Sequence, residues 1–257
     1  MENNKEFFLM KSTIIKAKFR DNTNSKIGLV ALSSDFSIEK DFNSVLLNLP
    51  INLFVNRLPF FNPLTHENLI KMTEKLTEVT KNILPDQTLD AVAYGCTSGT
   101  IAAGIDKIIN KIQSAKPNCK VITPITSAVK ALKHLNLKKI SVFTPYPQAI
   151  NEKVISYFKN EKFDIKSFAS FNLESDLDIG KIDPNYLFEV LAKMDTDDSE
   201  ALFISCTALP ALEIIQELEN KIKKTVLSSN QTLIWDSIRL VGYISSIEGY
   251  GKLFSNN

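Results

Sequence analysis

The stretch LDAVAYGCTSGT (residues 89–100) runs from apolar residues into a Cys-Thr pair, and ALFISCTALP (residues 201–210) repeats that order. In each stretch the apolar run stops at the cysteine, and a helical pattern follows. Near-continuous apolar runs of this length are typical of strands buried on both faces of a parallel sheet. We therefore interpret each stretch as a buried strand that turns into a helix at its Cys-Thr pair.

Similar apolar runs alternate with amphipathic helical patterns along almost the whole chain. Helices are expected at 66–84 and 209–224. Strands are expected at 26–32, 51–58, 89–95 and 120–124, and again at 139–145, 164–171, 201–206 and 224–228. Strands that alternate with helices indicate an α/β fold in which helices cover a parallel sheet.

The second set of four strands repeats the pattern of the first, with self-similarity at about 110 residues. We predict two pseudo-symmetric, duplicated domains, each a parallel β-sheet flanked by helices, with the active site in the cleft between them. Ligands of open parallel sheets bind at the carboxyl ends of the strands. Because both Cys-Thr turns follow such ends, we expect the two turns to face one cleft.

The domain boundaries have to be inferred from two helices, because no Gly/Ser-rich linker separates the halves. A helix at 127–136 is expected to cross from the first domain to the second, and a helix at 232–247 to return. The first domain then covers 25–125 plus 229–257, and the second covers 126–228. Residues 1–24 are polar and unpatterned, which is typical of a loose N-terminal extension.

Composition limits the function. The 257 residues are 44% hydrophobic and 23% charged, with a net charge of +1, so we expect no attraction to nucleic acid or to an anionic membrane. No apolar run reaches the roughly 18 residues of a membrane span, and the N-terminus lacks the features of a signal peptide. Three widely spaced cysteines indicate reduced thiols and a cytoplasmic location rather than a disulfide framework.

Familiar ligand motifs are missing from the sequence. There is no G-x-x-x-x-G-K-[ST] or G-x-G-x-x-G motif to bind nucleotide phosphates. The chain has only two histidines, His66 and His134, and no C-x-x-C pair. We therefore expect no metal site.

The two cysteines at the turns, Cys96 and Cys206, are the candidate catalytic residues. A thiol reacts as the thiolate, and its free pKa of about 8.5 is lowered at a helix N-terminus. Thr97 and Thr207 would cap the helices or present hydroxyls to a ligand, and the free N–H groups there would bind a carboxylate. Cys119 has no matching context and is expected to be a core residue.

The turns GCTSGT (95–100) and SCTALP (205–210) resemble the Asp/Glu racemase superfamily. They do so together with TPY (144–146), NRLPFFNPLTHENL (56–69) and IGLVALSSDFSIEKDF (27–42). The resemblance is to the branch of maleate cis–trans isomerases, arylmalonate decarboxylases and ectoine-utilisation proteins, and it covers about residues 26–245. It implies paired α/β domains, an active site between them and no cofactor.

By this resemblance Cys96 and Cys206 flank the substrate from opposite faces. In a racemase one thiolate removes a proton next to a carboxylate, and the other thiol reprotonates the opposite face. In a cis–trans isomerase one thiolate adds to the double bond, allows rotation and is then eliminated. Arylmalonate decarboxylases keep only the second cysteine, so the presence of both argues against decarboxylation.

The resemblance also implies substrate-binding residues. Each reaction builds negative charge on an oxyanion, which donors at Thr97, Ser98 and Thr207 would stabilise. Tyr146, the tyrosine of TPY, would hydrogen-bond the substrate, although a tyrosine that only closes a strand end is the structural alternative.

One loop departs from the maleate isomerase pattern. Where those enzymes typically carry an asparagine that binds a substrate carboxylate, this chain has Asp35. An aspartate repels a second carboxylate but holds an ammonium or a hydroxyl, unless it only caps the following helix. Ser34 in the same loop is a further candidate. Arg57 would pair with a substrate carboxylate or form a surface ion pair.

We predict a cofactor-independent isomerase of a small carboxylic acid, similar to maleate cis–trans isomerase, that uses the cysteine pair. An amino-acid racemase or epimerase, a β-elimination lyase and a non-catalytic small-acid binding protein stay open as alternatives. The expected partner is a small carboxylate or amino acid, with no nucleic acid and no membrane. The habit of the family predicts a homo-oligomer, either a dimer or a tetramer.

Overall fold

The computed structural model describes residues 14–19, 23–194 and 196–255, and it contains all eight predicted strands. The first sheet consists of β1 (Ser25–Leu32), β2 (Ile51–Leu58), β3 (Ala91–Tyr94) and β4 (Lys120–Ile122). The second consists of β5 (Lys139–Thr144), β6 (Asp164–Ser170), β7 (Ala201–Ile204) and β8 (Thr225–Ser228). All pairings are parallel, and the orders β2-β1-β3-β4 and β6-β5-β7-β8 are the same order used twice. The predicted α/β fold with a duplicated sheet is confirmed.

Two of the central strands, β3 and β7, are buried along their whole length, as their apolar sequences predict. Every residue of β3 and of β7 is buried, because helices cover both faces of each sheet. In the register, Tyr94 at the end of β3 pairs with Val30, and Ile204 at the end of β7 pairs with Phe143. Each Cys-Thr turn therefore follows the carboxyl end of an inner strand.

Helices connect the strands. They are α1 (Ile38–Leu46), α2 (His66–Met72), η1 (Thr73–Lys75), α3 (Leu76–Lys81), α4 (Thr97–Ala103), α5 (Ile105–Ala115), α6 (Pro124–His134), α7 (Gln148–Asn160), α8 (Asp176–Ile179), α9 (Pro184–Ala192), η2 (Leu212–Ile214), α10 (Ile215–Ile222), α11 (Ser229–Leu240) and α12 (Lys252–Ser255). The predicted helix 66–84 is present as α2, η1 and α3. The crossing helix predicted at 127–136 is α6, which starts earlier because proline is favoured in the first turn of a helix.

The helix predicted at 66–84 ends at Lys81, and two other predicted helices also have different bounds in the structure. The helix expected at 209–224 begins only at Leu212 as η2 and continues as α10, because Pro210 disfavours a helical conformation at the residue before it. The helix expected at 232–247 is α11, which starts at Ser229 because Ser228 and Gln231 form a capping box. It ends before Gly242, whose φ is +93°.

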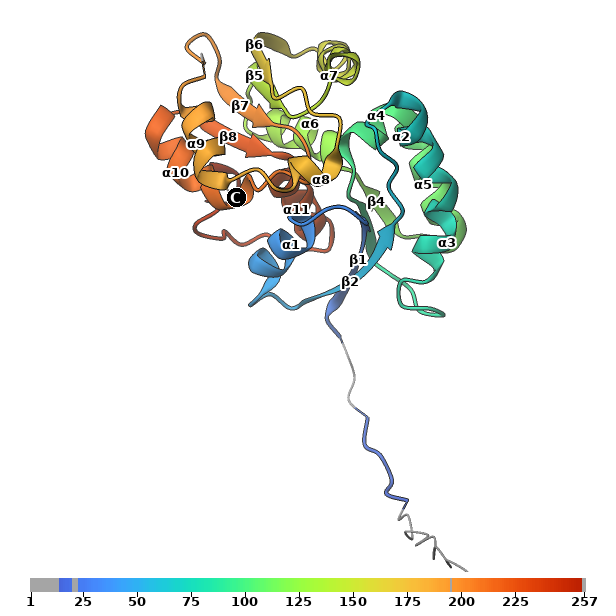
Figure 1. The fold of residues 1–257 in the computed structure, drawn as a ribbon. Helices are drawn as coiled ribbons and strands as arrows, with labels where there is room; N and C mark the ends of the chain where they lie inside the picture. The colour runs from blue at the N-terminus through green and yellow to red at the C-terminus, as the bar shows by residue number, and fades with distance from the viewer. Residues whose placement is uncertain (1–13, 20–22, 195, 256–257) are drawn as a thin grey trace, which may run out of the picture.

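Helix α11 lies between the two halves. It contacts α6, α1 and strands of both sheets, namely β3, β4 and β8, and Figure 1 shows it with α8 in the middle of the molecule. The residue bounds of the two domains stay a prediction, because α11 packs on both sheets.

The predicted N-terminal extension falls largely outside the described residues, since 1–13 and 20–22 are not among them. Residues 14–19 have no regular secondary structure and are exposed. In the described part of the chain, no helix combines the length and apolar character needed to cross a bilayer.

Candidate active site

Strand β3 delivers Cys96 to the start of α4, as predicted. Cys96 is the N-cap residue of this helix, and its Sγ accepts a hydrogen bond from the Gly99 N–H at 3.2 Å. The Ser98 Oγ lies 3.8 Å from the same sulfur. A Cβ at Gly99 would lie 2.8 Å from Cys96 Sγ and 2.3 Å from the Met72 methyl group. Glycine is therefore required for the close packing around this thiol.

The second turn differs from the prediction, because no helix begins directly after Cys206. Residues 205–211 are irregular, and the next helical residue is Leu212. Cys206 has a φ of +107°, which is rare for a residue other than glycine and costs about 1–3 kcal/mol. Its N–H donates a hydrogen bond to Ser229 Oγ at 3.0 Å, so packing against α11 holds the strained residue in place.

The pKa values of the two thiols are raised, which is opposite to the predicted direction. Burial raises the pKa of Cys96 to about 12, and the Gly99 N–H offsets this only in part. Burial also raises the pKa of Cys206 well above its usual range, and the nearby carboxylate of Asp176 adds to the shift. Cys96 is 3% exposed and Cys206 is 5% exposed. Desolvation disfavours the thiolate more strongly here than the helix N-terminus favours it.

A single hydroxyl group joins the two turns. Ser229 Oγ accepts hydrogen bonds from Thr97 Oγ1 at 2.9 Å and from the Cys206 N–H at 3.0 Å. Thr207 Oγ1 in turn donates to the Gly95 carbonyl oxygen at 3.2 Å. The two Cys-Thr turns, one from each sheet, therefore meet at the start of α11. The sequence analysis missed Ser229, for which the only signal was its place in the Ser-Ser-Asn start of a helix after β8.

Tyr146 lies with the cysteines. The turn that follows β5 is held by hydrogen bonds from Asn151, whose Nδ2 donates to the Tyr146 carbonyl oxygen at 2.8 Å and whose Oδ1 accepts from Thr144. The Tyr146 side chain is buried and lies near Ser205, Cys206 and Cys96. Burial and the nearby Cys206 raise the pKa of Tyr146 well above its usual range. The phenol is therefore a neutral hydrogen-bond donor.

The two oxygens of Asp35 have different surroundings. Oδ1 accepts hydrogen bonds from the N–H groups of Ser37 at 2.8 Å and Ile38 at 2.9 Å, so the helix-capping alternative holds for this oxygen. Oδ2 is buried and has no hydrogen-bond partner. Burial raises the pKa of Asp35, and the two N–H groups offset the shift in part.

Arg57 supports this loop from outside. Its guanidinium donates to the carbonyl oxygens of Leu32 at 3.0 Å and Asp35 at 2.8 Å, and it pairs with Glu39 at 2.6 Å. These contacts match the ion-pair alternative, so we assign Arg57 no direct contact with a substrate.

Asp176 and Asp41 are two further buried carboxyls that the sequence analysis missed. Asp176 begins α8 and accepts a hydrogen bond from the predicted site residue Ser34. Burial raises the pKa of Asp176 to about 6. Burial likewise raises the pKa of Asp41 to about 7, although Asn230 Nδ2 donates to it at 2.8 Å. A polar loop such as NLESD resembles exposed surface in sequence, so nothing local marked Asp176.

Four buried polar atoms near the turns have no hydrogen-bond partner among the residues that the structure describes. They are Asp35 Oδ2, Tyr94 Oη, Ser205 Oγ and Asn230 Oδ1. Such atoms are uncommon in folded proteins, and here they lie around Cys96, Cys206 and Thr207. A ligand with both donors and acceptors would satisfy them.

The site is closed in this structure. All of the predicted site residues except Arg57 are buried. Loops from the two halves are joined beside it, because the Leu64 N–H donates to Glu174 O at 2.8 Å and the Asp176 N–H donates to Asn62 Oδ1 at 3.2 Å.

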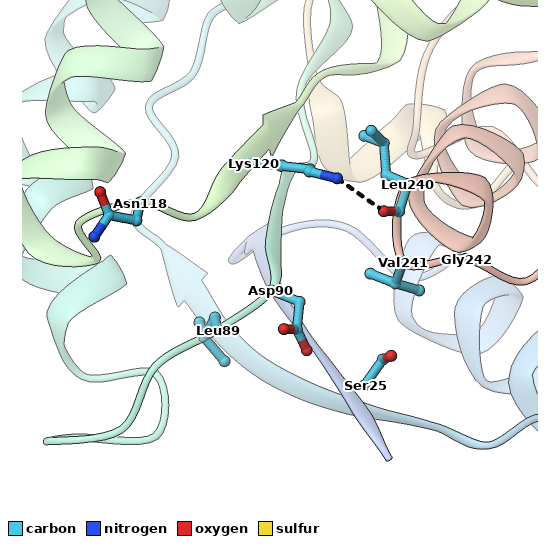
Figure 2. A pocket seen from close by; sticks show the side chains of 8 residues that line it. All are labelled: Ser25, Leu89, Asp90, Asn118, Lys120, Leu240, Val241 and Gly242. Atoms are coloured by element: carbon cyan, nitrogen blue, oxygen red, sulfur yellow. Dashed lines mark hydrogen bonds between the residues drawn. The ribbon is translucent and has the colours of Figure 1, made fainter. Parts of the chain in front are cut away.

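A separate cavity of about 540 Å³ lies at the other end of the first sheet. Figure 2 shows it beside Ser25, Asp90 and Lys120, at the amino ends of β1, β3 and β4, with Lys120 bonded to the Leu240 carbonyl. It is therefore distinct from the cysteine site. Among the residues that the structure describes, no three or more His, Cys, Asp and Glu side chains are grouped so that they could hold a metal ion.

The chain is similar to proteins of known activity in both sequence and fold. The sequence profile of the arylmalonate decarboxylase family matches residues 64–254. A maleate isomerase of Geobacillus stearothermophilus is 24% identical over 245 residues, which are 90% of this chain and 97% of that protein.

Two solved structures share the fold. The maleate isomerase of Pseudomonas putida superposes with a TM-score of 0.83 at 22% identity, over 90% of this chain and 98% of that one. A cysteine-to-serine mutant of the Nocardia farcinica maleate cis–trans isomerase, with a covalently bound succinylcysteine intermediate, also gives a TM-score of 0.83. That protein is 19% identical to this chain, and the superposition covers 91% of this chain and 99% of that one.

Proposed function

The chain belongs to the arylmalonate decarboxylase and maleate isomerase family of the Asp/Glu racemase superfamily, and from this premise we propose that it isomerises a small carboxylic acid through Cys96 and Cys206. The family comprises cofactor-independent isomerases and decarboxylases. The observation that carries the proposal is the Ser229 hydroxyl, which accepts hydrogen bonds from both Cys-Thr turns. Two cysteines from different sheets are thereby held at one site.

In the proposed chemistry one cysteine acts as the thiolate and the other as the thiol. We assign the thiolate to Cys96, because burial raises its pKa to about 12 and raises the pKa of Cys206 further, although hydrogen bonds oppose the shift at both sulfurs. Cys206, at the strained turn beside Tyr146, is the proton donor. Burial of both groups favours this division, because two thiolates in one dry site would repel each other.

Racemisation and cis–trans isomerisation would both begin with the Cys96 thiolate. In racemisation the Cys96 thiolate takes the α-proton, the electron pair moves onto the carboxylate, and the Cys206 thiol gives its proton to the opposite face. In cis–trans isomerisation the Cys96 thiolate forms a C–S bond, and the π electrons move onto the adjacent carboxylate. Rotation about the resulting single bond follows, and the same electrons then expel the thiolate.

The enolate-like intermediate needs donors that are fixed in place before the reaction. Tyr146 and Ser98 lie beside the thiols as neutral hydroxyl groups, and the free hydroxyl of Ser205 lies beside Tyr146. Removal of one such donor typically reduces the rate about 100- to 1000-fold. The closed site also keeps water from protonating the intermediate.

Proton NMR in D₂O tests the proposal. The protein is incubated with maleate, both enantiomers of aspartate and glutamate, small hydroxy acids and N-acetylated amino acids. We expect either fumarate formation or deuterium at an α-carbon, and loss of the signal in both Cys96→Ser and Cys206→Ser. Cys119→Ser is the control, because Cys119 is a buried free thiol outside the site. Turnover that survives in either of the two site variants would rule out the paired mechanism.

A further inference from the structure

The cysteine site has an acidic wall formed by Asp35, Asp41 and Asp176, which come from the loop after β1, from α1 and from α8. All three are buried. Both cysteines lie within the electrostatic influence of Asp176 and Asp35, and Asp41 lies within that of Asp35. The wall therefore adjoins the two thiols.

No buried basic side chain of the described residues neutralises this wall. The charged groups around it are Arg57, Glu39, Lys40 and Glu213, and they form two outer ion pairs, Arg57–Glu39 and Lys40–Glu213. Within the described residues Lys116 is the one buried lysine or arginine, and it donates to the carbonyl oxygens of Leu84 and Gln87. Arg57 and Lys40 therefore offset the effect of burial on the pKa values of Asp35 and Asp41 only in part, and from outside the wall.

Two buried acceptor atoms, one on Asp35 of the wall and one on the neighbouring Asn230, lack donors among the described residues. Asp35 is 2% exposed, and its Oδ2 has no hydrogen-bond partner. The Thr207 hydroxyl beside it donates instead to the Gly95 carbonyl oxygen. The amide of Asn230 is oriented by two acceptors, Asp41 Oδ2 and Thr207 O, both 2.8 Å from its nitrogen. Its Oδ1 must therefore be a free acceptor as well.

We propose that the substrate carries an ammonium group, which donates to Asp35 Oδ2 and lies within reach of the Asp176 carboxylate. This inference rests on the proposed function and narrows it to amine-bearing acids such as amino acids. An ammonium supplies three donors and no acceptor, which matches the two free acceptor atoms, Asp35 Oδ2 and Asn230 Oδ1. A dicarboxylate such as maleate would instead bring two more negative charges next to the buried carboxyls, where like charges repel strongly.

The same placement would activate the cysteines. Asp176 and Asp35 both disfavour the thiolate forms of Cys96 and Cys206. A bound cation between these carboxylates and the sulfurs cancels that effect, so the thiol can lose its proton once the amine is in place. The substrate itself then supplies the positive charge that favours the thiolate.

Calorimetry on the full chain tests the inference with pairs of acids that differ only in an amino group. The pairs are aspartate against succinate and glutamate against glutarate, with both enantiomers of each amino acid. We expect an amino member to bind at least about 100-fold more tightly than its partner. Titrations at about pH 6.5 in two buffers of different ionisation enthalpy also give the protons exchanged. A cation favours ionised carboxyls, so we expect proton release, whereas a dianion would cause proton uptake.

Two variants and one control test which carboxyl groups bind the ammonium group. Asp35→Asn keeps a side-chain oxygen that caps α1, and Asp176→Asn keeps the acceptor for Ser34, so both are expected to fold. Each should lose the preference for the amine and most of the proton release. Asp178→Asn is the control, because Asp178 is an exposed carboxylate of the same helix α8, paired with Lys181. It should behave as the wild type.

Several results would overturn the inference. They are equal or tighter binding of the dicarboxylates, proton uptake on binding, a response to Mg²⁺ or Ca²⁺ alone, or no binding by any amine. Cysteine-dependent conversion of maleate without amine binding would reject the inference and leave the proposed function standing. Amine binding with proton release but without cysteine-dependent turnover would reject the proposed function and keep the inference.

Discussion

Replacement of Ser229 by alanine should loosen the junction between the two cysteine turns. The change removes the oxygen that accepts from Thr97 Oγ1 and from the Cys206 N–H. A buried donor left without an acceptor costs about 1–3 kcal/mol. The Thr97 hydroxyl can rotate toward another acceptor, whereas the Cys206 N–H is fixed. We therefore expect a total loss of about 2–4 kcal/mol in the free energy of unfolding.

The same substitution should reduce turnover. Cys206 sits at a φ of +107°, and the Ser229 contact helps to hold that unfavourable conformation. When the contact is lost, the backbone can relax and displace the Cys206 sulfur. A displacement of about 1 Å typically costs about 100-fold in rate, so we expect a fall of about 10- to 100-fold in kcat.

Denaturant unfolding and the NMR rate assay measure the two effects. Ser237→Ala is the matched control, because Ser237 is a buried serine of the same helix whose hydroxyl donates to the Leu233 carbonyl oxygen inside α11. We expect Ser237→Ala to cost less than about 1 kcal/mol and to leave the rate unchanged. The reasoning is refuted if the two variants have the same stability and the same rate.

Three further predictions follow from the burial and strain of the site. Alkylation of Cys96 by iodoacetamide should be slow near neutral pH and rise about tenfold per pH unit, because its pKa of about 12 leaves little thiolate; fast labelling at neutral pH would contradict this. Cys206→Gly should be about 1 kcal/mol more stable than Cys206→Ala, since glycine relieves the positive φ, and denaturant unfolding of both would show the opposite order if the site is unstrained. Stability should fall by roughly 3–7 kcal/mol as the pH rises from about 4 to about 7, because the folded-state pKa values of Asp41 (about 7) and Asp176 (about 6) lie above the unfolded value. In this window the folded state binds more protons, so its advantage is lost as the pH rises, and Asp41→Asn should flatten the profile.

The strands were predictable because each is a run of apolar residues, and burial on both faces of a parallel sheet leaves no other pattern. The meeting of Cys96 and Cys206 was also predictable, since duplicated sheets place matching turns at matching strand ends. The sequence around a residue did not predict its place in the site where its contacts come from the other half of the chain. Ser229 and Asp176 act through residues far away in sequence, so a polar loop or a helix start gave no sign of their position.

The predicted direction of the thiol pKa shifts was wrong for the same reason. A helix N-terminus is visible in the sequence of the Cys96 turn, and it favours a thiolate. The same short stretch does not show that Cys96 is buried or that the Asp176 carboxylate lies nearby. These two effects raise the pKa of Cys96 more than the helix N-terminus lowers it. The oligomeric state, the cytoplasmic location and the domain bounds stay predictions.

Because burial and Asp176 raise the pKa values of both thiols, both cysteines stay protonated near neutral pH. With both thiols neutral, neither cysteine can begin the reaction until charge in the site changes. The site is buried, and the hydrogen bonds Leu64–Glu174 and Asn62–Asp176 join loops of the two halves beside it. Asp176 links the two observations, because it belongs to the loop contacts and also disfavours the thiolates. Binding of a cation at this residue would therefore couple closure of the site to formation of the first thiolate. That coupling would confine the reactive form of Cys96 to the complex with substrate.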